Sequence, residues 1–250
     1  MKQLISLLAI LLIISCNRDG EPADSDNLGE YILMNSDRAL DEVIACAGGR
    51  DIGLFSDDIV PTSVIYLPIE GVSDIRYFES EGLLDSLDYS AYSAVDLPSV
   101  PLFNGKLEKF NLDAFEGEKM GIVSFKTEGK LHLSNPIRLK TNTKPTEVNT
   151  ELVTIQESGV NPRFDWEVGL IDENAIYFQV ITDENDNFIS GTYTIEQNFT
   201  FYELDNVVLN ITDPESNPNL EPNKDYSFTL MGVSLDNWVN LLVKKDFTTN

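Results

Sequence analysis

Short runs of alternating apolar and polar residues make up most of the chain's second half. They are rich in β-branched and aromatic side chains, which favour strands over helices. In 226–230 the apolar side chains recur at every second position. The same spacing in 239–243 predicts that Val239, Leu241 and Val243 share one face. The predicted strands of this half are 164–166, 175–181, 199–202, 226–230 and 239–243.

Two hairpins are predicted in the first half. Asn104-Gly105 lies between short apolar runs, and this dipeptide is a strong hairpin signal because both residues tolerate positive φ. Glu128-Gly129 separates 122–125 from 131–133 in a similar way. Alternation puts His132 on the face opposite its two leucine neighbours. We therefore expect His132 on the solvent side of its strand.

One helix is predicted ahead of these hairpins. Apolar residues within 40–47 recur at the spacing of one helical face. Asn35 or Ser36 can cap the first turn, and Gly48 is placed to end the helix. A strand is expected soon after it, at 64–67.

Many short strands with a single helix favour an all-β fold built from β-sandwiches. Residues 141–150 are polar and contain a proline, which is typical of an interdomain linker. We therefore predict two tandem sandwiches, an N-terminal β-rich domain at 30–140 and a C-terminal domain at 151–250.

The segment from Leu220 to Phe228 resembles the fibronectin type III pattern of a leucine, a proline turn and a tyrosine that opens a strand. Trp166 lies about sixty residues before Tyr226, where such domains carry a core tryptophan. The resemblance covers roughly 145–248 and implies an immunoglobulin/fibronectin III-like sandwich. It also implies that the Tyr226 hydroxyl bonds back to the turn backbone. The first half has a similar closing hairpin without this tyrosine.

The first fifteen residues have the layout of an export signal. Lys2 precedes an apolar stretch at 4–14, which is interrupted only by Ser6 and is too short to span a bilayer as a helix. The stretch ends in Ile-Ile-Ser-Cys at 13–16, which resembles the lipobox of bacterial lipoproteins. The resemblance implies cleavage before Cys16 and attachment of acyl chains such as palmitate to its thiol. The alternative is an ordinary signal peptide with an incidental cysteine.

Residues 16–29 contain no large apolar side chain before Leu28 and are expected to form a flexible acidic tether. The acidity resembles export signals of Bacteroidetes-type surface lipoproteins. With tandem sandwiches, the resemblance implies a lipid-anchored protein of the cell envelope, in the outer membrane at its surface or periplasmic face. It implies a location and no activity.

The formal net charge is −25, and the loss of Lys2 with the signal would make it about −26. Because such an acidic surface repels nucleic-acid phosphates, nucleic acid is not an expected partner. With Cys16 carrying lipid, Cys46 has no disulfide partner. Cys46 lies in an apolar run, and we expect a buried, unreactive thiol.

Two segments carry candidate binding chemistry. Asp183, Asn185 and Asn187 offer the alternating oxygen ligands of a calcium loop, although Phe188 replaces the glycine that an EF-hand requires. An acidic hairpin loop without any cofactor is the favoured interpretation, and calcium is the alternative. Trp238 falls between two strands, where it either contacts a ligand such as a sugar or folds down to cap the core.

No catalytic motif is present, and the sequence predicts a protein that is not an enzyme. The expected role is a binding or structural surface, such as a glycan-binding accessory or an adhesin, with a glycan or an envelope protein as its partner. The alternative is an envelope hydrolase that acts on glycans with an acidic pair, because 42 acidic residues offer many candidate pairs.

Overall fold

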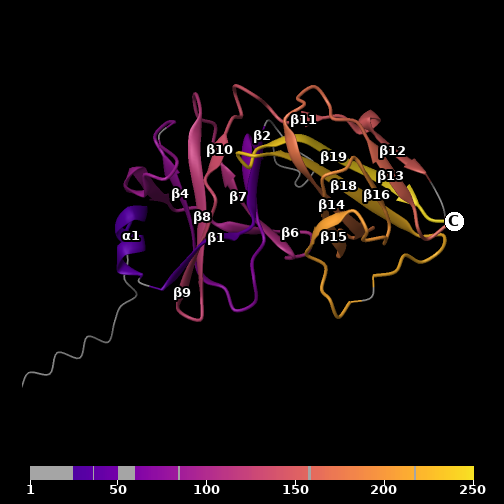
Figure 1. Ribbon diagram of the computed structural model, residues 1–250, viewed down its shortest axis with the longest axis horizontal. Helices are drawn as coiled ribbons and strands as arrows, with labels where there is room; N and C mark the ends of the chain where they lie inside the picture. The colour runs from indigo at the N-terminus through magenta and orange to yellow at the C-terminus, as the bar shows by residue number, and fades with distance from the viewer. Residues whose placement is uncertain (1–24, 36, 50–59, 84, 157–158, 217) are drawn as a thin grey trace, which may run out of the picture.

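The computed structural model describes residues 25–35, 37–49, 60–83, 85–156, 159–216 and 218–250. Within these residues the chain forms four β-sheets that follow one another along the long axis of the molecule (Figure 1). A short helix covers one end, and the second half of the chain forms the other end. The all-β fold with two sandwiches is confirmed.

The first sandwich is made of two sheets formed by residues 38–139. Sheet A has the strand order β1-β9-β8-β4-β5, with β10 also paired to β8, and sheet B has the order β2-β3-β7-β6. The strands of sheet A are β1 (Arg38–Val43), β4 (Ser73–Ser80), β5 (Tyr92–Val95), β8 (Lys119–Thr127), β9 (Lys130–Ser134) and β10 (Ile137–Leu139). Those of sheet B are β2 (Ala45–Gly49), β3 (Thr62–Tyr66), β6 (Ser99–Leu102) and β7 (Leu107–Leu112).

The second sandwich follows the same plan. Sheet C has the order β11-β19-β18-β14-β15-β17, and sheet D has the order β12-β13-β16. The strands of sheet C are β11 (Glu147–Val148), β14 (Asn174–Asp183), β15 (Phe188–Thr194), β17 (Val207–Asn210), β18 (Asp225–Ser234) and β19 (Val239–Thr248). Those of sheet D are β12 (Val153–Gln156), β13 (Arg163–Trp166) and β16 (Asn198–Thr200).

Apolar side chains fill every space between these layers. The core between sheets A and B includes Tyr77 and Phe110, and the core between sheets C and D includes Phe164 and Phe228. The Phe164 and Phe228 rings stack with centroids 4.1 Å apart. A third cluster lies between sheets B and C, so the two sandwiches are joined by a continuous apolar layer.

The Tyr226 corner forms as the fibronectin type III resemblance implied. Tyr226 is buried at the start of β18, and its hydroxyl accepts a hydrogen bond from the Glu221 backbone N–H at 2.8 Å. Trp166 is also buried, in the same core. The Asn104-Gly105 and Glu128-Gly129 turns form as well, and all four of their residues have positive φ.

The expected helix over 36–47 is wrong. Residues 38–43 and 45–49 are strands, and the helix is instead α1 (Leu28–Met34), with Asn27 as its cap. The small residues at the end of β2 serve close packing, because a Cβ on Gly49 would lie 2.6 Å from the Thr141 hydroxyl. Two 3-10 helices, η1 (Tyr89–Ala91) and η2 (Thr150–Leu152), complete the described elements.

The end of the expected tether at 16–29 is also folded where the structure describes it. Leu28 is fully buried against sheet A, together with Tyr31 and Phe78. The backbone carbonyl of Asp26 accepts a hydrogen bond from the Ala94 N–H. The rest of this segment, residues 16–24 with Cys16, lies outside the described residues.

Two expected side-chain orientations are corrected. His132 is buried rather than on the solvent side, because α1 covers one face of sheet A and sheet B covers the other. Its Nδ1 lies 2.9 Å from a Glu42 carboxylate oxygen. Val239 does not share a face with Leu241 and Val243. The register between β18 and β19 shifts beside Val233, and this shift turns the Val239 side chain toward sheet B.

Candidate functional site

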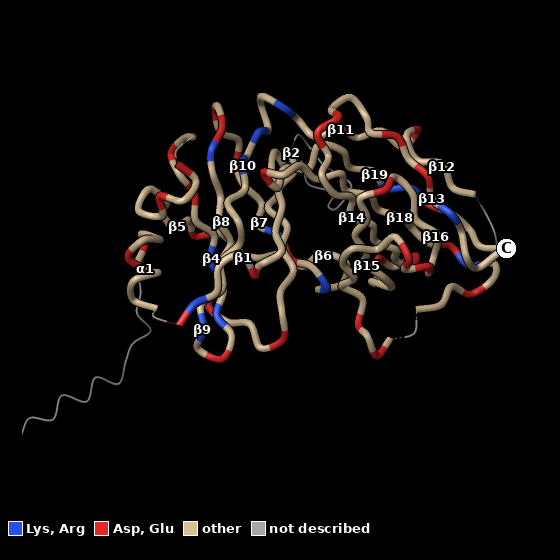
Figure 2. The backbone as a smooth tube through the Cα atoms, in the orientation of Figure 1, with Lys and Arg blue, Asp and Glu red and all other residues tan. Residues whose placement is uncertain are grey.

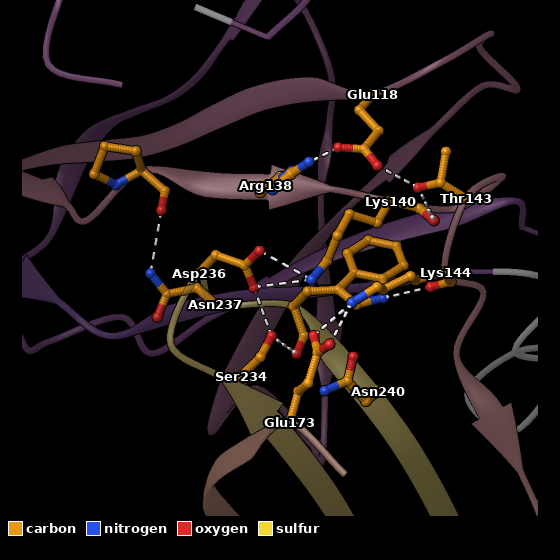
Figure 3. Close-up of polar contacts among 12 residues, drawn as sticks. Glu118, Arg138, Lys140, Thr143, Lys144, Glu173, Ser234, Asp236, Asn237 and Asn240 are labelled. Atoms are coloured by element: carbon orange, nitrogen blue, oxygen red, sulfur yellow. Dashed lines mark hydrogen bonds and ion pairs between the residues drawn. The ribbon is translucent and has the colours of Figure 1, made fainter. Parts of the chain in front are cut away.

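The tip of the β18–β19 hairpin, residues Leu235–Trp238, reaches out of the second sandwich into the first. Asn237 has a φ of 61°, and the Ser234 N–H donates to the Trp238 carbonyl at 2.9 Å, which closes the turn. The Ser234 hydroxyl also donates to Asp236 at 2.6 Å. Figure 3 shows Asp236 and Asn237 of this hairpin tip among residues of the first half, such as Arg138 and Lys140.

Trp238 is inserted into the core of the first sandwich. Its exposed fraction is 0%, and it packs in the cluster between sheets A and B with Val64 and Phe125. Its indole N–H donates to the Lys144 carbonyl at 2.8 Å, so its one donor is satisfied. A ring buried in this way offers no face to a ligand. The burial of the ring matches the core-cap interpretation of Trp238, except that the core belongs to the other sandwich.

Backbone hydrogen bonds hold the hairpin tip on both sides. The Ala47 N–H donates to the Asn237 carbonyl at 3.0 Å, and the Arg138 N–H donates to the Asp236 carbonyl at 3.0 Å. The Asn237 side-chain amide donates to the Pro136 carbonyl at 3.2 Å. These bonds extend the sheets of the first sandwich onto a loop of the second.

An ion pair adds to this contact. The Lys140 ammonium lies 2.9 Å from Asp236, and the Lys140 side chain is only 4% exposed (Figure 3). Burial by itself would raise the pKa of Asp236, but hydrogen bonds from Ser234 and Lys140 and the charge of Lys140 lower it overall. Asp236 is therefore ionised at neutral pH, and it compensates a lysine that has little access to water.

The segment expected as a linker, 141–150, is fixed in the same place. The Thr146 hydroxyl donates to the Val239 carbonyl at 2.7 Å and accepts from the Gly49 N–H at 2.8 Å. The Thr146 N–H in turn donates to the Gly49 carbonyl. One side chain thus connects the hairpin, the linker and sheet B. We call the following region the joint. It consists of the hairpin tip, the adjacent Val239 and their contacts with Ala47, Pro136, Arg138, Lys140, Lys144 and Thr146.

An apolar seam runs on from the joint between sheets B and C. Ile65 and Leu107 of sheet B meet Phe178, Met231 and Leu242 of sheet C. Strand β18 is therefore buried on both faces, with Phe228 and Leu230 turned to sheet D. Two domains that share a packed apolar layer do not move freely against one another.

Cys46 lies at this seam and borders a cavity of about 90 Å³ with Tyr193 and Phe178. It is a free cysteine with a partly buried side chain. Burial raises the pKa of its thiol to about 12, so the reactive thiolate is scarcely populated at neutral pH. This position fits the expected unreactive thiol.

The acidic segment of the second sandwich forms the turn between β14 and β15. Both Asp183 carboxylate oxygens accept hydrogen bonds from within the turn, from the backbone N–H groups of Asn185 and Asn187 and from the Asn187 side chain. Burial would raise the pKa of Asp183, but the bonds from Asn187 and Asn185 lower it. These bonds take up part of the acceptor capacity that a calcium ion would need from Asp183. Among the described residues no group of three or more His, Cys, Asp or Glu side chains is placed to hold a metal ion.

Asp and Glu positions are spread along the backbone of both sandwiches (Figure 2). One hollow of about 380 Å³ in the second sandwich is bordered by Glu184, Asp225 and Asp246. Asp225 accepts a hydrogen bond from the Thr248 hydroxyl, and Asp246 accepts one from Ser227, each at 2.6 Å. These are cross-strand contacts that stabilise the sheet.

No protein-family model matches the chain, and no curated protein matches it. Among solved structures, it is similar to a crystal structure of domains from titin, with 11% sequence identity, a TM-score of 0.29, and 85% of this chain covered. The chain spans 61% of that titin chain. It is also similar to the crystal structure of the chicken CNTN1 FN1–FN3 domains, with 11% identity, a TM-score of 0.31, and 86% and 68% of the two chains covered. At these TM-scores the likeness carries no argument, and the fold rests on the strand order described above.

Sequence reasoning missed the joint. Its contacts join residues about ninety positions apart, such as Trp238 with Lys144. Sequence patterns over a few residues cannot predict contacts at that separation. One signal was available. Residues 228–233 contain no polar face, which indicates a strand that is covered on both sides. A strand that is apolar on both faces needs a second packed layer, which a single two-sheet sandwich does not supply.

Proposed function

We propose that the chain is a lipid-anchored, non-enzymatic protein of the cell envelope, which carries its acyl chains on Cys16. In this proposal the two sandwiches form one rigid spacer that presents a binding surface away from the outer membrane. The sequence of residues 1–16 supports the anchor. Within the described residues no helix is long and apolar enough to cross a bilayer. In this proposal the acyl chains on Cys16 provide the attachment.

The joint is the observation that carries the proposed spacer role. Trp238, the Lys140–Asp236 ion pair and the apolar seam fix the second sandwich against the first. Helix α1, which follows the proposed anchor, lies at one end of the molecule, and sheet D lies toward the other (Figure 1). A rigid unit attached at the α1 end would hold the far sandwich at a defined distance from the membrane.

Detergent partitioning of the expressed chain tests the anchor. Wild-type protein should enter the detergent phase and incorporate labelled palmitate, whereas Cys16→Ala should remain in the aqueous phase without label. Cys46→Ala is the matched control, because it removes the other cysteine and leaves the proposed anchor in place. Acylation of the Cys16→Ala protein, or loss of label from Cys46→Ala, would show that the anchor is assigned wrongly.

Distance measurement between the sandwiches tests the spacer. Spin labels at Asp113 and Asp205, which are exposed on the first and the second sandwich, should give one narrow distance distribution. The Trp238→Ala variant should broaden it, because the joint then loses its central contact. A broad distribution in the wild-type protein would contradict a rigid unit. Protease treatment of intact cells would establish which face of the membrane carries the protein.

A further inference from the structure

A groove of about 410 Å³ lies beside the seam and takes its walls from both sandwiches. The first sandwich contributes the 103–106 turn between β6 and β7. The second contributes residues 187–189 at the start of β15, together with Asp213 and Ser216. Its volume falls in the range of about 300–1,000 Å³ that is typical of small-molecule sites. Such a groove exists only while the two sandwiches are held in register.

Hydrogen bonds across the seam set the shape of this groove. The Asn104 side-chain amide donates to the Asn187 side-chain oxygen at 2.9 Å. Asn187 is itself held by Asp183, to which its side-chain amide donates at 2.8 Å. The amides are therefore positioned by the folded protein before any ligand arrives. This preorganisation reduces the entropic cost of binding.

The groove combines an aromatic ring with several polar groups. The Phe188 ring is partly exposed, and the Lys106 ammonium lies 5.2 Å from its centroid. Asp213 and Ser216 are exposed on the opposite loop. One Asp213 oxygen accepts from the Glu215 N–H, which leaves the other carboxylate oxygen able to accept from a ligand. An apolar surface beside amide, carboxylate and hydroxyl groups suits a ligand with an apolar face and a rim of hydroxyls.

The charges in the groove favour a neutral ligand. Lys106 forms no ion pair with any carboxylate in the described part of the chain, and it lies in the same groove as Asp213. Lys106 would repel a cationic ligand, and Asp213 would repel an anionic one. The net charge of −25 repels anionic polymers in addition. A neutral ligand that is rich in hydroxyls meets neither repulsion.

We propose that this groove binds a sugar unit of a neutral polysaccharide. This inference rests on the proposed function, because it names the class of ligand that the proposed binding surface recognises. Asp213 and Asn104 would bond to sugar hydroxyls, Lys106 would donate to a hydroxyl or to the ring oxygen, and Phe188 would contact the C–H face of the sugar. Binding would depend on the joint, since the joint keeps the two walls of the groove together.

Native gel electrophoresis with polysaccharide cast into the gel tests this proposal on the complete lipidated protein in detergent. The neutral probes are a β-glucan, a galactomannan, an arabinoxylan and starch, and the anionic probes are polygalacturonate and alginate. We expect at least one neutral polysaccharide to retard the wild-type protein. Asn104→Gly and Asp213→Asn should each weaken that binding tenfold or more on titration with the matching oligosaccharide. Gly tolerates the positive φ at position 104, and Asn keeps the turn at position 213.

Asp113→Asn is the matched control, because Asp113 is exposed beyond the end of β7 opposite to the groove. It should bind as the wild type does. Lys106→Ala gives a second variant in the groove, and thermal unfolding shows whether each variant is folded. Retardation by no neutral polysaccharide, retardation only by the anionic probes, or equal binding by the groove variants would overturn the proposal. The proposed function is tested by detergent partitioning and by the distance distribution, which do not depend on polysaccharide binding. Failure of the sugar proposal therefore leaves the proposed function intact, and the reverse also holds.

Discussion

The β18–β19 hairpin carries a buried aromatic side chain toward each of its ends, and the two differ in what they stabilise. Tyr226, at the start of β18, bonds to Glu221 only five residues earlier and packs in the core of its own sandwich. Trp238, at the turn, packs in the core of the other sandwich and bonds to Lys144. The first contact fixes a corner within a domain. The second makes the stability of one domain depend on a residue of the other.

Truncation of the tryptophan should have the largest effect. Trp238→Ala removes a fully buried ring and should destabilise the protein by about 3–5 kcal/mol, as large-to-small changes in packed cores do. Hydrogen exchange should show the loss of protection in β3, β7 and β8 of the first sandwich. Trp166→Ala is the matched control, because Trp166 packs only in the second sandwich, and its effect should stay there. Unchanged exchange in the first sandwich of Trp238→Ala would contradict the joint.

Neutralising the ion pair of the joint should have an intermediate effect. Asp236→Asn leaves Lys140 buried without a counter-charge and should cost about 1–2 kcal/mol at pH 7, less than for a fully buried pair because Asp236 is partly exposed. The pKa of Asp236 is lowered in the folded state, so its contribution is complete above the unfolded pKa of about 4 and is lost as the pH falls through the folded pKa.

Denaturant unfolding at a series of pH values measures this contribution. The difference in unfolding free energy between wild type and Asp236→Asn should shrink as the pH falls below about 4. Asp113→Asn, which alters an exposed carboxylate outside the joint, should show no such convergence. A difference that stays constant down to pH 2 would mean that the charge of Asp236 contributes nothing.

Removal of the tyrosine hydroxyl should have a smaller and local effect. Tyr226→Phe leaves the Glu221 N–H without its partner and should cost about 1 kcal/mol, near the net value of one hydrogen bond. The change in hydrogen exchange should be confined to the second sandwich. A spread of the effect into sheets A and B would remove the distinction between the two ends of the hairpin.

Calcium should have the smallest effect. Millimolar calcium is expected to leave the melting temperature almost unchanged, because the Asp183 oxygens already accept hydrogen bonds from their own turn. A rise of several degrees that Asp183→Ala abolishes would show that this turn binds the ion.

The parts of the fold that depend on neighbouring residues could be predicted from the sequence. The two Gly-containing turns, the strands β13, β14, β18 and β19 and the Tyr226 corner follow from spacings of a few residues, whereas β15 and β17 were not predicted. The helix over 36–47 failed because apolar residues in a short run fit a strand as well as a helix, and only pairing with β9 and β3 decides between them.

The joint and the groove could not be predicted in this way. His132 was expected on the solvent side because alternation shows that two faces differ, and it does not show that both faces are covered. Trp238 presented the same difficulty, since its partners lie in another sheet pair. The groove requires Asn104 and Asn187 to meet, and that contact exists only after the seam has formed.

The place of Trp238 in the chain sets the order in which the protein can mature. It follows the last strand of sheet A by roughly a hundred residues. A chain that is synthesised from its N-terminus therefore has a first sandwich with an unfilled core until the second half has been made. During that interval the exposed apolar surface between sheets A and B is a target for chaperones and proteases. Loss of a few residues around position 238 should thus remove the first half of the protein from the cell as effectively as damage to the first half itself.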